Sequence, residues 1–409
     1  MAEAIFKNAT LSIAKATDTF NPDDTVQLGT TEFIKRMIRF SATAGDNRHN
    51  LAVEEVLNKD ESKRDFKCFS RNTRDEAGNT VKGSNYEVKW SERTKPENIE
   101  KAANFRRYIF DTETFGVRRD IKAIIDGLSA DGIPETELME KYGVKTLDEA
   151  KELQKKSWAK QKVFITAYDY AEMLSKLFKA NKIKDMRFDI TCEINYEYNA
   201  EKNEWYQKFV PKSIYKARPD GKPESTGSMV FVFNPKNCVD DADFETTGEA
   251  RISGYVKQYM YGCVEKNYFV PVTLVVNKKF NSEGKNEAAA MLKKMKKKTD
   301  KDWNEIELKL AIVNGSQYVE FSEDLMDDEM REDYECGLIT FEDARKQFFA
   351  SLKDGKGIKG EREQYIAAVG LAKSGVAPTE YTDEDIYKIP VKKAKVAKAT
   401  EELDDDLFD

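Results

Sequence analysis

Hydrophobic and polar residues alternate with a period of two through the middle of the chain. From 186 to 198 every second residue is apolar or aromatic, and the residues between are polar or charged. This pattern is typical of a β-strand with one buried and one wet face. The turn NAEKNE and the segment WYQKFVPKSIYKA follow, so residues 186–217 are predicted to form a long antiparallel hairpin.

Further strands are predicted after the Pro- and Gly-containing linker RPDGKPESTGS. They are expected at 229–233, 249–263, 268–278, 305–313 and 317–321, with the basic helix AAAMLKKMKKKTDK between the third and the fourth. Five strands with a helical interruption match the strand count of a small Greek-key barrel of the OB class. The predicted fold class is therefore α+β, with one or two OB-like antiparallel β-barrels and added helices.

The spacing of apolar residues divides the whole chain into four expected regions. Residues 1–158 are expected to form an α+β region of unclear role, with a hairpin from DFKCFS and NYEVKW and helices between 96 and 156. Residues 159–322 hold the OB-like strands, and residues 323–390, including EREQYIAAVGLAKSG, are predicted helical. Residues 391–409 are predicted to be a disordered tail, basic and then acidic.

Charge and composition exclude several classes of protein. The 409 residues include 40% hydrophobic and 34% charged residues, no apolar run long enough to span a bilayer and no signal-peptide centre. Five scattered cysteines and the single His49, expected in an exposed loop, predict no zinc site, disulfide framework or cofactor and favour a reduced cytoplasmic compartment. The net charge is −7, but the last ten residues hold six acids, and the rest of the chain carries only −1. A nearly neutral body can still present basic grooves.

Aromatic and basic residues share predicted strand faces and loops. On 249–263 one face is apolar, and the other carries Arg251, Tyr255, Lys257, Tyr259 and Tyr261. Aromatic rings that stack on bases and cations that contact phosphates are what binding of unpaired nucleic acid requires. A second buried face is the alternative for this strand, and a solvated helix face is the alternative for the lysines. The further candidates are Trp205, Tyr206 and Lys208 in the hairpin and Lys293, Lys294, Lys296, Lys297 and Lys298 in the basic helix.

The tail ATEELDDDLFD and the segments KDMRFDITCEINYEY and EWYQKFVPKSIY resemble phage-type and bacterial single-stranded DNA-binding proteins. The resemblance covers about 160–320 and 391–409. It implies a body that binds single-stranded DNA and a tail, here Asp404, Asp405, Asp406, Leu407 and Phe408, that recruits replication, recombination or repair proteins. It further implies an origin in a bacteriophage or mobile element, hence the host cytoplasm, and no membrane partner.

Two alternatives remain open at this point. The string YIFDTETFG is close to the first motif of DEDD-type 3′–5′ exonucleases, in which Asp111 and Glu113 would hold catalytic magnesium. No second motif of that family follows, and no nucleotide-binding loop occurs, so we predict a non-enzymatic protein without catalytic or metal-binding residues. The other alternative is a phage scaffolding or assembly protein. The sequence leaves homo-oligomerisation open.

Overall fold

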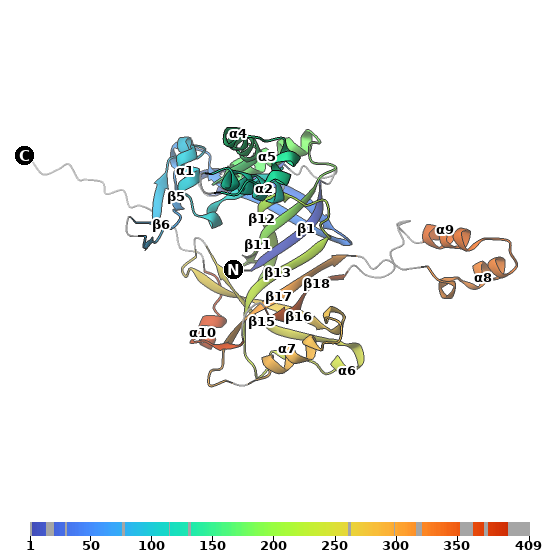
Figure 1. The fold of residues 1–409 in the computed structure, drawn as a ribbon. Coiled ribbons are helices and arrows are strands. Elements are labelled where there is room, and N and C mark those ends of the chain that lie inside the picture. Colours follow the sequence, from blue (N-terminus) through green and yellow to red (C-terminus); the bar gives the residue numbers. More distant parts are fainter. Residues whose placement is uncertain are drawn as a thin grey trace, which may run out of the picture.

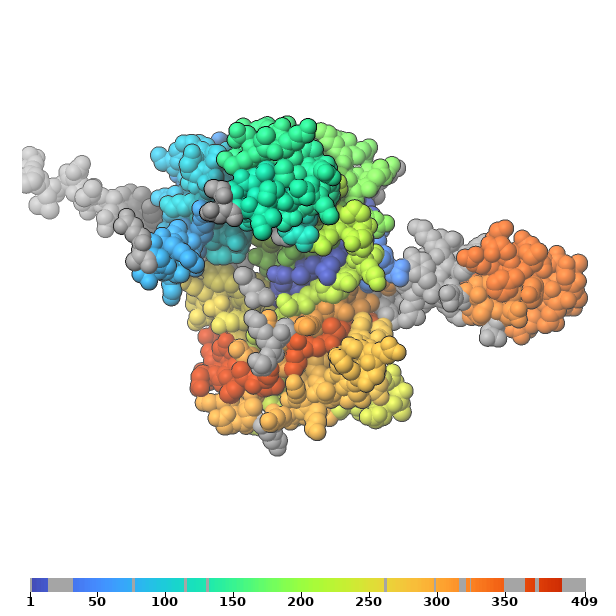
Figure 2. All heavy atoms as spheres, viewed as in Figure 1, coloured from blue at the N-terminus to red at the C-terminus, as the bar shows by residue number. Residues whose placement is uncertain are grey.

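The computed structural model describes residues 2–13, 20–28, 31–75, 78–113, 115–129, 132–260, 263–297, 299–315, 321–351, 363–371 and 375–391. The fold is mixed α+β and is dominated by one large, mostly antiparallel sheet (Figure 1). Helices and a small hairpin cover one end of this sheet (Figure 1). In the space-filling view, helices α2–α4 (residues 115–158, green) lie at the opposite end from the yellow and orange strands (Figure 2). No helix among the described residues is both long and apolar enough to cross a membrane.

Five of the described strands, which lie between residues 3 and 216, pair in a closed ring. They follow one another as β1–β3–β4–β12–β11 and return to β1; only β4 and β12 run parallel, at Leu51 and Phe209. Several further helices and short strands lie between the third and fourth of these strands in sequence. The last of them, helix α5, buries Tyr170 and Leu174 in the core. The bounds are β1 (Glu3–Ser12), β3 (Thr31–Ala44), β4 (Asn47–Asn58), α5 (Ala167–Lys179), β11 (Arg187–Asn199) and β12 (Glu204–Lys216).

A second closed ring, again of five strands within the described segments, follows in the chain. Its order is β13–β15–β16–β18–β17 and back to β13, and only β16 and β18 run parallel. Gly254 permits the closure, because a Cβ there would lie 2.5 Å from the Phe231 ring and from the Val232 carbonyl oxygen. The bounds are β13 (Glu224–Phe233), β15 (Glu249–Tyr259), β16 (Asn267–Asn277), α7 (Glu287–Met295), β17 (Asn304–Gly315) and β18 (Glu363–Leu371).

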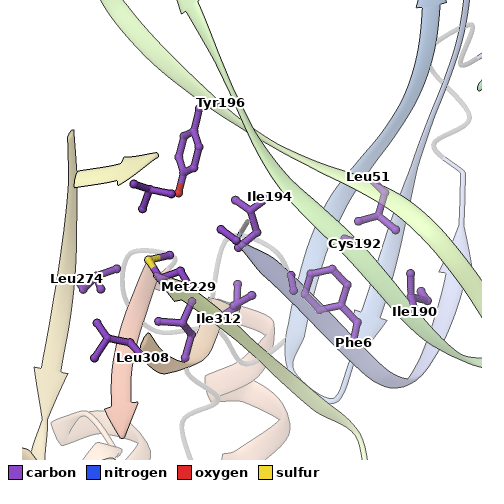
Figure 3. Close-up of a cluster of buried hydrophobic side chains, with 14 of the residues drawn as sticks. Phe6, Leu51, Ile190, Cys192, Ile194, Tyr196, Met229, Leu274, Leu308 and Ile312 are labelled. Carbon is purple, nitrogen blue, oxygen red and sulfur yellow. The ribbon is translucent and has the colours of Figure 1, made fainter. Parts of the chain in front are cut away.

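The two rings share one hydrophobic core. β1 pairs with β13, and Gly227 lies so close to the Glu3 carbonyl that a side chain would not fit there. Figure 3 shows the result: Phe6 and Ile194 of the first ring lie in the same cluster as Leu308 and Ile312 of the second. Most strands of the rings bury every second side chain in this cluster, so burying these side chains holds both rings together.

The remaining elements surround the rings. The strands are β2 (Phe20–Leu28), β5 (Phe66–Phe69), β6 (Thr73–Arg74), β7 (Thr80–Val81), β8 (Asn85–Val88), β9 (Tyr108–Asp111), β10 (Gln161–Phe164), β14 (Val239–Asp240) and β19 (Ala377–Pro378). The helices are α1 (Pro96–Lys101), α2 (Phe115–Gly127), α3 (Thr136–Tyr142), α4 (Leu147–Trp158), α6 (Phe244–Thr247), α8 (Asp328–Glu335), α9 (Phe341–Ser351) and α10 (Asp383–Ile386). Helices α8 and α9 form their own apolar cluster and project from the sheet in Figure 1.

Several local predictions are confirmed. Strand β11 alternates as expected and pairs with β12 across the predicted hairpin. β5 and β8 form the predicted N-terminal hairpin. Helices α1–α4 lie in the predicted helical range, and Thr146 and Glu149 form a capping box at the start of α4. On β15, Ala250, Ile252 and Val256 are buried, and the opposite face is the more exposed one.

Other predictions are wrong. The helix expected over EREQYIAAVGLAKSG is instead strand β18, which supplies the fifth strand of the second ring. His49 is not in an exposed loop: it is fully buried on β4, stacked on Phe6 at 4.1 Å between ring centroids. The boundary expected between 158 and 159 passes through the first ring, since β1, β3 and β4 pair with β11 and β12. The strand expected at 317–321 lies almost wholly outside the described residues.

Candidate nucleic-acid interface

A groove of about 1060 Å³ lies over the outer face of β3 and β4, beside the β11–β12 hairpin. Strands β3 and β4 supply its floor, and the hairpin and its turn form its wall. We call it the central groove. It is lined by Arg39, Phe40, Ser41, Asn50, Leu51, Ala52, Glu197, Tyr198, Asn199, Ala200, Glu201, Lys202, Tyr206, Gln207, Lys208 and Phe209.

The cations of the central groove are of two kinds. Lys208, a predicted site residue, is half-buried, with Nζ 2.8 Å from Glu54 Oε1 and 2.5 Å from Glu197 Oε2. Burial lowers the pKa of Lys208, but the hydrogen bonds to these two carboxylates outweigh it and raise the pKa, so the ammonium group keeps its charge. Arg39 and Lys202 are exposed and form no ion pair with any described residue. They are therefore the cations most available to a phosphate.

Aromatic rings lie on the hairpin wall. Tyr206 is 40% exposed, and its hydroxyl donates a 2.8 Å hydrogen bond to Glu204 Oε2, which raises the pKa of Tyr206. Trp205 is half-buried, with its ring tilted against Tyr198 at 5.1 Å between centroids. Tyr206 thus presents more free ring surface than Trp205.

Two smaller hollows share lining residues with the central groove and are also lined by residues of the second ring. One of about 510 Å³ shares Asn50, Gln207 and Phe209 with the groove, and one of about 250 Å³ shares Tyr198. Trp205 lines both of the smaller hollows. Tyr255 lines the second of them. The predicted residues Trp205, Tyr206, Lys208 and Tyr255 therefore line either the central groove or a hollow that shares residues with it.

The rest of the predicted tyrosine stripe on β15 is partly covered. The Tyr255 ring packs edge-on against Trp303 and Tyr387, at 5.6 and 6.0 Å, and burial raises the pKa of its hydroxyl. Lys257 Nζ lies 3.4 Å from the hydroxyl of Tyr381. The residues of the stripe that stay exposed are Arg251, Lys257 and Tyr259, and Tyr261 lies outside the described residues.

The predicted lysines of α7 lie elsewhere. Met291, Leu292 and Met295 pack into the core, which turns Lys293, Lys294, Lys296 and Lys297 outward. Lys296 forms a 2.5 Å ion pair with Asp241. These lysines line a separate hollow of about 810 Å³ beside Phe244, and it shares no lining residue with the central groove. Lys298 is not among the described residues.

The carboxylates of the exonuclease hypothesis are paired with cations. Asp111 is fully buried at the end of β9, forms an ion pair with Arg118 and accepts a 3.0 Å hydrogen bond from Gln161 Nε2. Glu113 Oε2 lies 2.6 Å from Lys160 Nζ. Among the residues that the structure describes, no three His, Cys, Asp or Glu side chains are grouped so that they could hold a metal ion.

Sequence reasoning missed the contribution of β3 and β4. Arg39 and Asn50 belong to a region without an assigned role, although Ile34, Ile38 and Phe40 recur at even spacings that a strand would explain. The tail residues Asp404, Asp405, Asp406, Leu407 and Phe408 lie outside the described part of the chain. No protein-family model, curated protein or solved structure matches this chain.

Proposed function

We propose that the chain is a non-enzymatic single-stranded DNA-binding protein whose two rings are OB-type barrels. In each ring the strands, numbered in chain order, follow one another as first, second, third, fifth and fourth, and the third and fifth run parallel. In each ring a helix directly precedes the fourth strand, α5 before β11 in one ring and α7 before β17 in the other. This strand order supports the proposal that each ring is a five-stranded Greek-key barrel.

One observation carries the proposal: the position of the central groove. OB-type barrels bind oligonucleotides over their second and third strands, between the loops that join strands one and two and strands four and five. In the first ring these second and third strands are β3 and β4, and the fourth and fifth are β11 and β12. The groove is lined by residues of these four strands and of the β11–β12 turn.

Binding would combine stacking with charge. Tyr206 offers a ring for a base, Arg39 and Lys202 offer cations for phosphates, and the connected hollows continue toward Trp205 and Tyr255. Such contacts do not read base edges, so binding is expected to be largely independent of sequence and to weaken with salt. The acidic tail would recruit replication, recombination or repair proteins in the host cytoplasm.

A gel-shift experiment on labelled single-stranded oligonucleotide, with and without magnesium, tests the proposal. Retarded, intact DNA under both conditions is the expected result. DNA shortened only in the presence of magnesium would support the exonuclease alternative through Asp111 and Glu113. DNA that migrates unchanged would overturn the proposal and leave the scaffolding alternative.

A further inference from the structure

A second cleft lies on the first ring, away from the central groove. It is enclosed by helices α2 and α4 on one side and by strand β1 and residues 215–224 on the other, and its volume is about 1160 Å³. Figure 2 shows the green helices standing over the dark-blue start of the chain on this face. We call it the α2–α4 cleft, and it shares no lining residue with the central groove.

The lining of the α2–α4 cleft is strongly basic. It contains seven cationic side chains against three carboxylates. Lys7 and Lys122 are paired with Glu224 and Asp126. The exposed Lys216, Arg218 and Lys222 form no ion pair within the described chain. The cations are Lys7, Arg118, Arg119, Lys122, Lys216, Arg218 and Lys222, and the carboxylates are Asp126, Asp189 and Glu224.

An aromatic and apolar surface lies within this basic rim. Trp158, the last residue of α4, lines the cleft and is 50% exposed. The Arg118 guanidinium lies 4.3 Å from its ring centroid. Tyr215, Ile121 and Ile125 complete the apolar lining. Arg118 therefore covers part of the Trp158 ring, and the exposed half of the side chain is left as a stacking surface in a preformed hollow.

Two buried polar atoms of the cleft residues are left without partners. Arg118 Nε and Ser157 Oγ are buried and form no hydrogen bond within the described part of the molecule. The Arg118 side chain is only 11% exposed, although its terminal nitrogens contact Asp111 and the Ser157 carbonyl oxygen. Both atoms are covered by the protein itself, so the exposed cations at the rim of the cleft are the groups that a phosphate could contact.

We propose that the α2–α4 cleft binds a nucleotide unit, with its base stacked on the exposed part of Trp158 and its phosphate held by Lys216 and Arg218. This site goes beyond the proposed function, because it would hold a nucleotide independently of the central groove. The nucleotide could be free or part of a strand. In the latter case the chain would contact nucleic acid on two separate surfaces.

The test measures quenching of tryptophan fluorescence in the full-length chain by deoxythymidine monophosphate, by inorganic phosphate and by oligothymidine. Stacking on Trp158 predicts saturable quenching by the mononucleotide that is lost in Trp158→Phe. The double variant Lys216→Gln/Arg218→Gln should weaken mononucleotide binding by about 5-fold or more, as expected for loss of about 1 kcal/mol or more. Lys151→Gln/Lys155→Gln removes the same charge from the exposed face of α4, outside the cleft, and should bind like wild type.

Each outcome bears on the site. Quenching by the mononucleotide supports a site for free nucleotides, and Trp158-dependent quenching by oligothymidine alone supports a site for a strand. The site is overturned if neither ligand gives Trp158-dependent quenching, or if the two double variants are weakened equally. Inorganic phosphate that competes as well as the mononucleotide would overturn the role of the base. A chain that binds the mononucleotide but fails to shift oligonucleotide would keep this site and lose the proposed function.

Discussion

Removing the Tyr206 ring should weaken binding of single-stranded DNA without unfolding the protein. Tyr206 is 40% exposed at the wall of the central groove, so much of its ring is free to contact a base. A base–aromatic stack contributes about 1–3 kcal/mol, which corresponds to a dissociation constant raised about 5- to 140-fold in Tyr206→Ala. Its ring lies outside the buried core, so the free energy of unfolding should change by about 0.5 kcal/mol or less.

The phenylalanine variant separates the ring from its hydroxyl. Tyr206→Phe keeps the stacking surface and loses only the hydrogen bond to Glu204, so it should bind like wild type. Phe105→Ala, at an aromatic residue 49% exposed outside the groove, is the matched control. Fluorescence anisotropy with labelled oligothymidine at low salt gives the dissociation constants. Wild-type affinity in Tyr206→Ala would refute the stacking argument, and equal losses in both Tyr206 variants would assign the effect to the hydroxyl.

Three further predictions concern charge, closure of the second ring and pH. Arg39→Gln should make the plot of log association constant against log salt concentration less steep by about 0.7, because one phosphate contact to a single strand is lost. An unchanged slope in anisotropy titrations would show that Arg39 does not contact the bound DNA. Gly254→Ala should reduce the free energy of unfolding, measured by denaturant titration, by about 1–3 kcal/mol. Gly370→Ala, at a position with open space for a Cβ, should reduce it by less. Equal losses in the two variants would contradict the close approach at Gly254. Burial raises the pKa of the Glu55 carboxyl above its ordinary 4.5, although the Tyr168 amide donates a hydrogen bond to it. The native state therefore holds the Glu55 proton more tightly than the unfolded state, and the free energy of unfolding falls as pH rises from about 4.5 through the raised pKa. Glu55→Gln should raise the melting temperature at neutral pH and lose this advantage below about pH 4.5; calorimetry that finds the same gain at every pH would contradict the assignment.

The strands that sequence reasoning located are those with one wet face. Residues of β11 alternate strictly because Ile190 and Ile194 face the core while their neighbours face outward. Strand β18 does not alternate in this way. Ala367 and Ala368 are both buried, so β18 has no wet face at this point, and helix α7 packs against the strand. A short run of small apolar residues does not distinguish a buried strand from a helix.

The candidate site depends on contacts between distant residues. Tyr206 and Lys208 could be named from their hairpin, but the groove also needs β3 and β4. Of these two strands only β4 pairs with β12, at Leu51 and Phe209, which are far apart in sequence. His49 likewise looks polar and exposed in its local sequence. Its burial depends on Phe6 and on a 2.9 Å hydrogen bond with Ser225, which belongs to β13. Such pairings follow from how the rings close, which no local pattern specifies.

Photocrosslinking can show whether the central groove binds single-stranded DNA. The full-length chain is crosslinked to single-stranded oligothymidine, and the crosslinked peptides are identified by mass spectrometry. An oligonucleotide of about 30 residues suffices, since one OB-type fold covers about 4–16 nucleotides. We expect intact DNA crosslinked to peptides that contain Tyr206 or residues 39–52 of the central groove. Crosslinks that avoid these peptides and fall on the α7 lysines instead, or no crosslinking at low salt, would contradict this expectation.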